Sequence, residues 1–445
     1  MTQHFGLPGW VAALLLAGCG GADPGVPPDG APLSLVSSDM AATAIPTDTL
    51  AETQGAPADS PQGLRQRINT LRQTAGLNPL ASHTALQQAA DNHARWSVTL
   101  DHTGHVEDLD DPGWSGSTPP ERARSSGYAG FDAVGEVMGY GGNASAALDG
   151  LMSGIYHRMA LLRHDADELG AAFVSDTQGS LRGTLTVLTG NSRISALCAG
   201  PDNVTTPAWH LLCDPARRVS PADYRAARDA WSLGNPDLVV WPPDQAVGVT
   251  PVAYGETPDP LPDLAVSGLP LSAAFNLRRV GMVTVEHFAL TDVTRGVTVT
   301  PLRRLDQASD PQGRLQAGEY ALFPLQRLDY GTRYRAELAY TLDGVPGQRQ
   351  WEFTTIDPGS VHRISARGEV VTVAAGEVIH IYVPPTPEWP LLGAWQMQYA
   401  GRGTVSAAWH DANTLRIAFD GAPGERVEFL LQDGSGGSFQ LRIRP

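Results

Sequence analysis

Few residues of this 445-residue chain have types and spacing that suggest chemistry. His105 stands in a loop with four acidic residues, where a cation site is one interpretation and solvated surface charge is the one we favour. His93 lies on the apolar side of a predicted helix and is expected to be a satisfied core histidine. No GxSxG elbow, HExxH helix, P-loop or paired CxxC occurs, so the common hydrolase and NTPase routes lack motif support.

The three cysteines give a clearer signal. Cys198 and Cys213 bracket the turn-rich loop AGPDNVTTPAWHLL, and in an exported chain this spacing predicts a local disulfide. Two unpaired buried thiols are the alternative. A zinc site is disfavoured because only His210 lies between the two cysteines.

The third cysteine belongs to the N-terminal segment. The apolar run LPGWVAALLLAG, residues 7–18, is too short to span a bilayer but suits the core of a signal peptide. Leu16-Ala17-Gly18-Cys19 resembles the bacterial lipobox, which implies cleavage before Cys19 and lipidation of that residue. A secretory signal with an incidental cysteine is the alternative. Residues 2–6 carry no Lys or Arg, unlike an ordinary signal peptide.

Charge and composition limit the partners. The formal net charge is −16 and the pI is about 5.1, and no run of basic residues occurs, so we expect no nucleic-acid partner. The expected partners are instead the membrane, through a lipid anchor, and an envelope component or small ligand. Hydrophobic residues make up 42% of the chain, which is compatible with several folded domains.

Periodicity and composition divide the chain into successive segments. After Pro61 several stretches of helical spacing are followed by two strand-like runs, which predicts an α+β or α/β/α region, and short strands with turn signals follow Trp241. One long helix is predicted from Ser145 to Leu162. The predicted segments are a signal peptide (1–18), a disordered tether (19–60), an α/β domain (61–192), a connector with the disulfide loop (193–238), a β-sandwich (239–356) and a C-terminal β-sandwich (357–445).

The α/β segment contains a series of fragments in a distinctive order. They read LRQRINTLRQTAGLNPL, HTALQQAADNHARW, LDHTGH, ERARSSGY, GEVMGYG, LDGLMSGIYHRMALL and ELGAAFV. Their order and spacing resemble a bacterial CAP domain, from the superfamily of cysteine-rich secretory, antigen-5 and pathogenesis-related proteins. The resemblance covers roughly residues 61–192. It implies an α/β/α sandwich with a cleft lined by His and Glu.

The resemblance also suggests site residues. The family's cleft histidines correspond to His102 of LDHTGH and His157 of YHRMALL, and its cleft glutamate corresponds to Glu136 of GEV. A second cleft glutamate, present in many animal and plant members, would stand near Ser153 and is missing. The family's Asn after the glutamate is Val137 in this chain.

Two imidazoles and one carboxylate allow three interpretations. They can ligate zinc or another divalent cation, so His102, Glu136 and His157 are candidate metal and ligand-binding residues. The same groups can transfer protons, because His titrates near neutral pH and burial can raise a Glu pKa toward it. They can also hydrogen-bond one another in a purely structural role.

The β segments resemble bacterial Ig-like modules. Residues 240–262 read VWPPDQAVGVTPVAYGETPDPLP, and residues 328–355 read LDYGTRYRAELAYTLDGVPGQRQWEFTT. The spacing of Gly331 and Tyr334 suits a turn leading into a strand whose Tyr packs at a sandwich corner. Such modules are commonly spacers or adhesive units, and a sandwich without a ligand is the favoured interpretation.

The expected fold is therefore an α/β/α sandwich followed by two all-β sandwiches. The expected location is outside the cytoplasm, lipid-anchored and facing the periplasm or cell exterior. The favoured function is a non-catalytic binding or structural module with a His/Glu cleft. An envelope hydrolase that uses the same cleft is the alternative.

Overall fold

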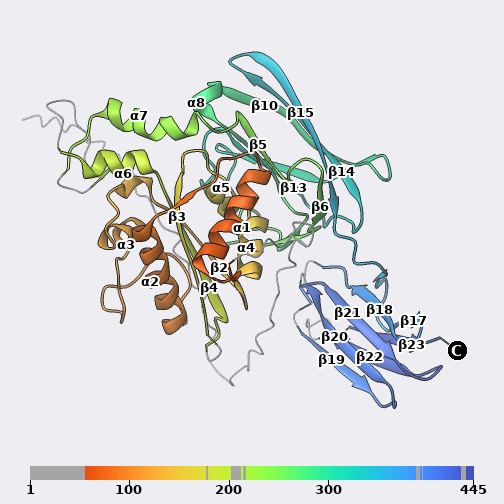
Figure 1. The fold of residues 1–445 in the computed structure, drawn as a ribbon. Coiled ribbons are helices and arrows are strands. Elements are labelled where there is room, and N and C mark those ends of the chain that lie inside the picture. The colour runs from red at the N-terminus through yellow and green to blue at the C-terminus, as the bar shows by residue number, and fades with distance from the viewer. Residues whose placement is uncertain are drawn as a thin grey trace, which may run out of the picture.

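The computed structural model describes residues 56–176, 179–201, 212–213, 217–386, 391–392, 394–431 and 437–444. The predicted signal peptide, Cys19 and most of the predicted tether lie outside the described residues. An α/β domain is followed by two β-sandwiches (Figure 1), which confirms the expected fold class. Among the described helices, none is long and apolar enough to cross a membrane.

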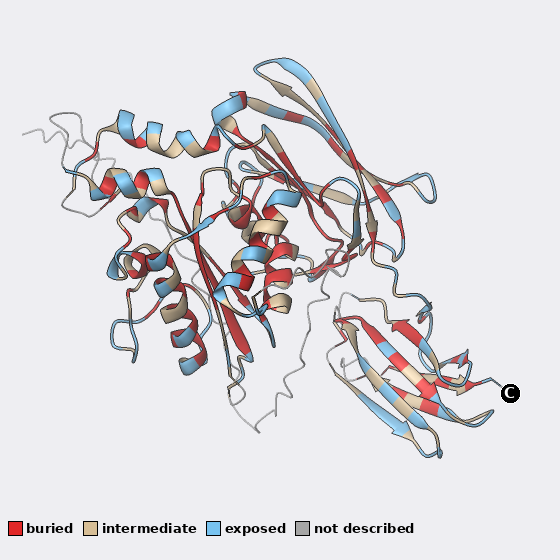
Figure 2. Cartoon of the chain, viewed as in Figure 1, coloured by how far each residue is buried: buried red, intermediate tan, exposed pale blue. Residues whose placement is uncertain are grey.

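The α/β domain is built on a four-stranded sheet in the order β1-β3-β4-β2. All residues of β4 are buried, because helices cover both faces of the sheet (Figure 2). Val187 of β4 packs with the core on one face, and Leu188 packs with the core on the other. The strands are β1 (Ala81–Ser82), β2 (Gly135–Tyr140), β3 (Glu168–Ser175) and β4 (Gly183–Gly190).

The helices form the two outer layers. Helices α1, α4 and α5 share one apolar core with the sheet, while α2 and α3 pack on the opposite face. Helix α2 approaches the sheet closely at Gly170, where an added Cβ would lie 2.1 Å from the backbone of α2. The helices are α1 (Pro61–Thr74), α2 (Thr84–Leu100), α3 (Pro119–Ser125), α4 (Ala144–Ser153) and α5 (Ile155–Leu161).

The prediction of one helix from Ser145 to Leu162 is wrong, because the chain breaks at Gly154. This residue has φ −74° and ψ 139°, an extended conformation that ends α4 and begins α5. The carboxylate of Glu256 accepts a hydrogen bond from the backbone N–H of Ile155, at 2.5 Å. A residue distant in sequence therefore accepts the hydrogen bond of the first backbone N–H of α5. Local hydrophobic periodicity carries no sign of such a contact, so it could not reveal the break between α4 and α5.

The first β-sandwich packs two antiparallel-rich sheets around an aromatic core that includes Trp351, Phe353 and Phe288. Tyr334 is buried and its hydroxyl accepts a hydrogen bond from the backbone N–H of Asp329, which confirms the predicted corner. The sheets are β11-β10-β14-β15-β6 and β12-β13-β9-β5. Their strands are β5 (Leu238–Trp241), β6 (Ala246–Val249), β9 (Leu271–Phe275), β10 (Val283–Asp292), β11 (Val297–Thr298), β12 (Leu302–Asp306), β13 (Glu319–Pro324), β14 (Arg333–Leu342) and β15 (Val345–Thr355).

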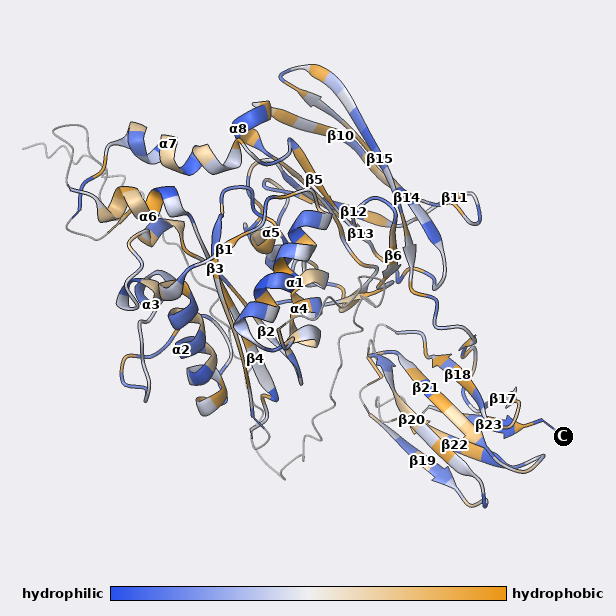
Figure 3. Ribbon diagram, viewed as in Figure 1, coloured by the Kyte–Doolittle hydropathy of each residue, from blue (hydrophilic) through white to orange (hydrophobic). Residues whose placement is uncertain are grey.

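The second β-sandwich has its own core, in which Phe419, Phe429 and Phe439 are fully buried. Apolar and polar residues alternate along its strands (Figure 3), as expected for sheets with one buried face. The sheets are β16-β18-β21-β20 and β17-β23-β22-β19. Their strands are β16 (Val361–Arg363), β17 (Glu369–Val373), β18 (Glu377–Tyr382), β19 (Trp395–Tyr399), β20 (Thr404–Asp411), β21 (Thr414–Asp420), β22 (Arg426–Leu431) and β23 (Ser438–Ile443).

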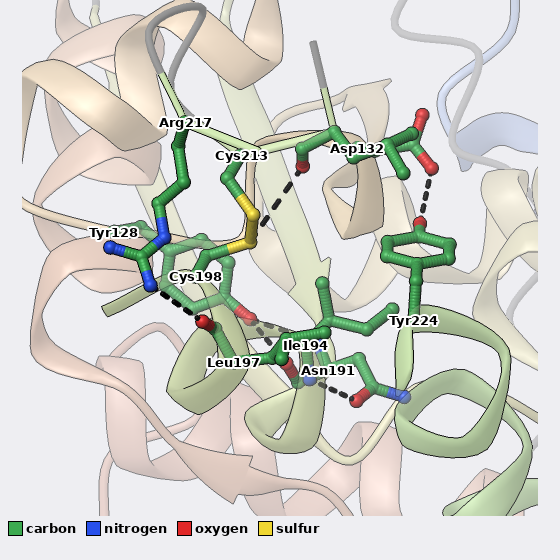
Figure 4. The surroundings of a disulfide bond; sticks show 10 residues. Tyr128, Asp132, Asn191, Ile194, Leu197, Cys198, Cys213, Arg217 and Tyr224 are labelled. Atoms are coloured by element: carbon green, nitrogen blue, oxygen red, sulfur yellow. Dashed lines mark hydrogen bonds between the residues drawn. A yellow bond between two sulfur atoms is a disulfide. The ribbon is translucent and has the colours of Figure 1, made fainter. Parts of the chain in front are cut away.

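Two helices and a disulfide connect the α/β domain to the first β-sandwich. Cys198 of α6 (Ser192–Ala199) is bonded to Cys213, which confirms the predicted pairing (Figure 4). Both cysteines pack with Tyr224 of α7 (Pro221–Ser232), whose hydroxyl donates a hydrogen bond to Asp132. The disulfide thus holds the connector against the α/β domain.

We predict that the double variant Cys198→Ser, Cys213→Ser unfolds at lower urea concentration than the parent chain. The bonded cysteines are 15 residues apart, and closing a loop of that length contributes about 3 kcal/mol to the free energy of unfolding. Reduced parent protein is the control and should match the variant. Two freely alkylatable thiols in the native, unreduced protein would contradict the pairing.

Candidate functional site

Glu136 lies on β2 at the centre of a buried polar network. Arg122 of α3 donates from one guanidinium nitrogen to both carboxylate oxygens, at 2.7 and 2.9 Å. The ring Nδ1 of His105 lies 2.8 Å from the same carboxylate. The side chains of Arg122 and Glu136 are 0% and 1% exposed, so water does not screen this ion pair.

The charges around Glu136 keep it ionised. Burial by itself raises the pKa of this carboxyl group, but Arg122, His93 and the His105 hydrogen bond outweigh burial and lower the pKa to about 2. A group with this pKa carries no proton to donate near neutral pH. The Glu136 carboxylate is therefore a fixed negative charge that binds Arg122, and it cannot act as a general acid.

A second buried carboxylate extends the network. Glu107 is fully buried, accepts a hydrogen bond from the backbone N–H of Ser115 at 2.6 Å, and lies 2.8 Å from Nδ1 of His93. The interpretation of the His105 loop as solvated charge is confirmed for Asp108 and Asp110, which are exposed, and is wrong for His105 and Glu107, which are buried. The core role expected for His93 fits its burial and its ring contacts, to Glu107, the Gly104 carbonyl and the Met138 sulfur.

His102 does not join this network. It follows the end of α2 on the surface, and its ring packs edge-on against Trp96, with 5.6 Å between ring centroids. His105, three residues later, contacts Glu136 instead. The fragment LDHTGH offers two histidines, and only the alternation of buried His105, exposed Val106 and buried Glu107 identifies the inward one. That alternation becomes evident only with the structure.

His157 contacts a carboxylate from the other domain. It lies on α5, and its ring Nδ1 is 2.7 Å from Oε2 of Glu256, in the loop after β7 (Ala253–Tyr254) of the first β-sandwich. The Glu256 side chain is 9% exposed and the His157 side chain 16%. Sequence reasoning missed Glu256, because no pattern near residue 256 indicates a contact 99 residues away.

A cleft of about 680 Å³ is lined by the His105–Glu136 pair and by His157, the histidine of the second pair. His105, Glu136 and His157 line it from the α/β domain, and His102 does not. The opposite wall comes from the first β-sandwich, including Phe275, Asn276, Arg314 and Gln316. The cavity is therefore an interdomain cleft, formed by residues of both domains.

The cleft also contains charged groups near α7. Arg163 donates to both oxygens of Asp165, at 2.6 and 3.0 Å. Burial raises the pKa of Glu319 and lowers the pKa of His164 to about 4. His164 is consequently neutral at physiological pH, and the charge in this part of the cleft comes from arginine and carboxylate groups.

The structure does not assemble the predicted metal trio. Within the described ranges, no three His, Cys, Asp or Glu side chains are placed to share a metal ion. His102 is exposed and is not among the residues that line the cleft, and the Glu136 carboxylate is already paired with Arg122. His102, Glu136 and His157 therefore do not converge, and the residues present do not fit the expected zinc or other divalent cation.

We predict that Glu136→Gln lowers the free energy of unfolding by about 3 kcal/mol, because it removes the closer of the two carboxylates that pair with buried Arg122 and leaves only Glu107, at 3.7 Å. The folded-state pKa of Glu136 is depressed, so its stabilisation is present above about pH 4.5 and is lost as pH falls toward 2. Urea titrations at pH 7 and pH 3 measure both effects, and the variant should lose less stability than the parent on acidification.

Glu352→Gln is the matched control for this experiment. Its carboxylate accepts two hydrogen bonds from Arg335 at the surface, and an exposed pair of this kind contributes at most about 1 kcal/mol. Equal losses in the two variants would contradict the buried network as a source of stability.

Comparisons with known proteins identify the first domain. The family model described as "Cysteine-rich secretory protein family", CAP, matches residues 65–191. Comparison with curated proteins gives no match.

Among solved structures, an outer surface protein of Borrelia burgdorferi is 21% identical, with a TM-score of 0.24, covering 28% of this chain and 88% of that one. An extracellular SCP-domain protein of Bacillus anthracis is also 21% identical, with a TM-score of 0.23, covering 29% of this chain and 40% of that one. With these TM-scores, neither structure supports an inference about the function of this chain. The residues that match the family model are those that form the α/β domain. Residues 65–191 are therefore a CAP domain of the cysteine-rich secretory protein family, and two β-sandwich domains follow it in the chain.

Proposed function

We propose that this protein is an exported, lipid-anchored envelope protein that binds a small ligand in the cleft between its CAP domain and first β-sandwich. The observation that carries the proposal is the state of Glu136. Its carboxylate lies at the cleft yet is held ionised by Arg122 and contacted by His105. Such a group shapes and charges a binding site, and a carboxyl group held ionised has no proton to donate to a substrate.

Export is supported by features of the sequence. The apolar run before Cys19 suits a signal peptide, and the Cys198–Cys213 disulfide suits an oxidising compartment. The description of the matched family as secretory agrees with this location. A lipid on Cys19 would then anchor the mature chain to the membrane.

An envelope hydrolase is the second candidate, and the His157–Glu256 pair favours it. A histidine held by a carboxylate can act as a general base toward a water molecule or a substrate hydroxyl. The two candidates share the same cleft and differ in turnover. They are separated by product formation from chromogenic ester, glycoside and phosphate substrates, measured for the parent chain and for His157→Gln.

Ligand binding is tested by thermal unfolding with a panel of N-acetylated sugars and fatty acids. A ligand at one hundred times its Kd adds about 2.7 kcal/mol to the free energy of unfolding and raises the Tm. The variant Ala317→Trp should abolish this gain, because Ala317 is an exposed residue of the cleft wall and a Trp there fills the cavity. Ala374→Trp, at an exposed position of the second β-sandwich, should keep it. Equal gains in both variants would contradict binding in the cleft.

Anchoring is tested separately at the N-terminus. We predict that Cys19→Ser releases the protein from the membrane fraction or blocks cleavage of the signal peptide, because the lipid-bearing thiol is gone. Cell fractionation and the mass of the mature N-terminus measure the outcome. Ser37→Ala, in the predicted tether, is the control and should leave both unchanged. Membrane association that survives Cys19→Ser would contradict the lipid anchor.

A further inference from the structure

The His157 ring has two different surroundings. Its Nδ1 lies 2.7 Å from a carboxylate oxygen of Glu256. His157 is among the residues that line the cleft, whereas Glu256 is not. The ring has its Nε2 edge on the side away from Glu256.

The chemistry of the contact sets the tautomer of the ring. A carboxylate only accepts hydrogen bonds, so Nδ1 must carry the proton that joins it to Glu256. In a neutral imidazole the other nitrogen then has a lone pair and no proton. Nε2 of His157 is thus a hydrogen-bond acceptor on a residue that lines the cleft.

Glu256 is itself held in place from the α/β domain. Its Oε1 accepts hydrogen bonds from the backbone N–H groups of Ile155, at 2.5 Å, and Tyr156, at 3.2 Å. The absence of a side chain at Gly154 makes this approach possible. A Cβ at Gly154 would lie 2.5 Å from Oε2 of Glu256 and 3.3 Å from Nδ1 of His157.

Apolar packing fixes the distance between the two domains at this point. Ile155 and Met159 of α5 are buried against Leu261, Ala274 and Phe323 of the first β-sandwich. The position of Glu256 relative to His157 therefore follows from a buried interface, and it does not depend on the contact between the two side chains alone.

We propose that Glu256 is a positioning residue which holds His157 so that Nε2 accepts a hydrogen bond from a ligand in the cleft. The ligand class is one that offers a hydroxyl or amine hydrogen at that point, beside the apolar wall formed by Met159 and Phe275. The proposal rests on the proposed function of the cleft. It makes the first β-sandwich a part of the binding site, because the CAP domain alone lacks the carboxylate that orients its histidine.

The tautomer is measured directly, without any ligand. The mature chain with Cys19→Ser is labelled with ¹⁵N-histidine, and long-range ¹H–¹⁵N correlations at pH 7.5 identify the protonated nitrogen of each ring. The His157 signals are those that vanish in His157→Gln. We expect a protonated Nδ1 and a bare Nε2 in the parent chain.

Two variants should change that result by different routes. Glu256→Ala removes the acceptor, and Gly154→Ala displaces it sterically while moving only the end of a flexible side chain. Both should shift the His157 proton from Nδ1 toward Nε2. Asp310→Asn is the matched control, since Asp310 also joins the two domains but accepts its hydrogen bond from Tyr156. It should leave the His157 tautomer unchanged.

Access to Nε2 is measured with diethyl pyrocarbonate, which modifies bare ring nitrogens, followed by mass spectrometry of the His157 peptide. Modification should be several-fold slower in Ala317→Trp, which fills the cleft, and unchanged in Ala374→Trp. A proton on Nε2 in the parent chain, a tautomer insensitive to Glu256→Ala, or equal modification in both Trp variants would overturn the proposal. None of these results bears on whether the cleft binds the panel ligands, so the two proposals can fail independently.

Discussion

The packing of the seven-residue helix α5 is the constraint on which the rest of the cleft depends. On one side this helix contacts β2 of the CAP sheet, and on the other it contacts β9 of the first β-sandwich. Arg158 at its centre is fully buried and donates to the carbonyl oxygens of Met152 and Pro270, one in each domain. Burial lowers the pKa of Arg158 to about 9, which leaves the guanidinium charged at neutral pH. Separation of the domains would expose the apolar interface and break these contacts, so the first β-sandwich cannot be a loosely attached spacer.

The buried charges of the CAP domain have a second consequence. Glu107 and Glu136 approach Arg122 from the loop before α3 and from β2, and such groups are costly to bury unless each is paired. The pairing orders the loop from Gly104 to Ser117, which has no helix or strand of its own. Residues that resemble catalytic groups in the sequence therefore serve here to fix a loop and to line a cleft. The identity of a residue and its place in a family motif do not determine its chemistry, because the neighbours decide how it titrates.

Part of this arrangement could be predicted from the sequence. The resemblance of the ordered fragments to a CAP domain implied the α/β/α sandwich. Turn signals with short strands predicted the two β-sandwiches, because strand patterns depend on local periodicity. The site was predicted less well. Two histidines in LDHTGH fit one motif position, and the direction in which His102 and His105 point is set by tertiary packing. Glu256 could not be found at all, because a contact between residues 99 positions apart leaves no periodic pattern.

The joint between the two β-sandwiches is polar, in contrast to the apolar interface at α5. Asp411 is 3% exposed and accepts hydrogen bonds from Arg327 at 2.6 Å, Tyr330 at 2.7 Å and Tyr254 at 3.2 Å. Removing one partner from such a buried charged cluster costs about 3 to 5 kcal/mol, so the cluster fixes one relative orientation of the sandwiches.

Tyr254 stands two residues before Glu256, so the segment from residue 254 to 256 contacts the second β-sandwich at one end and His157 of the CAP domain at the other. Both interdomain contacts therefore depend on a single short stretch of backbone at β7.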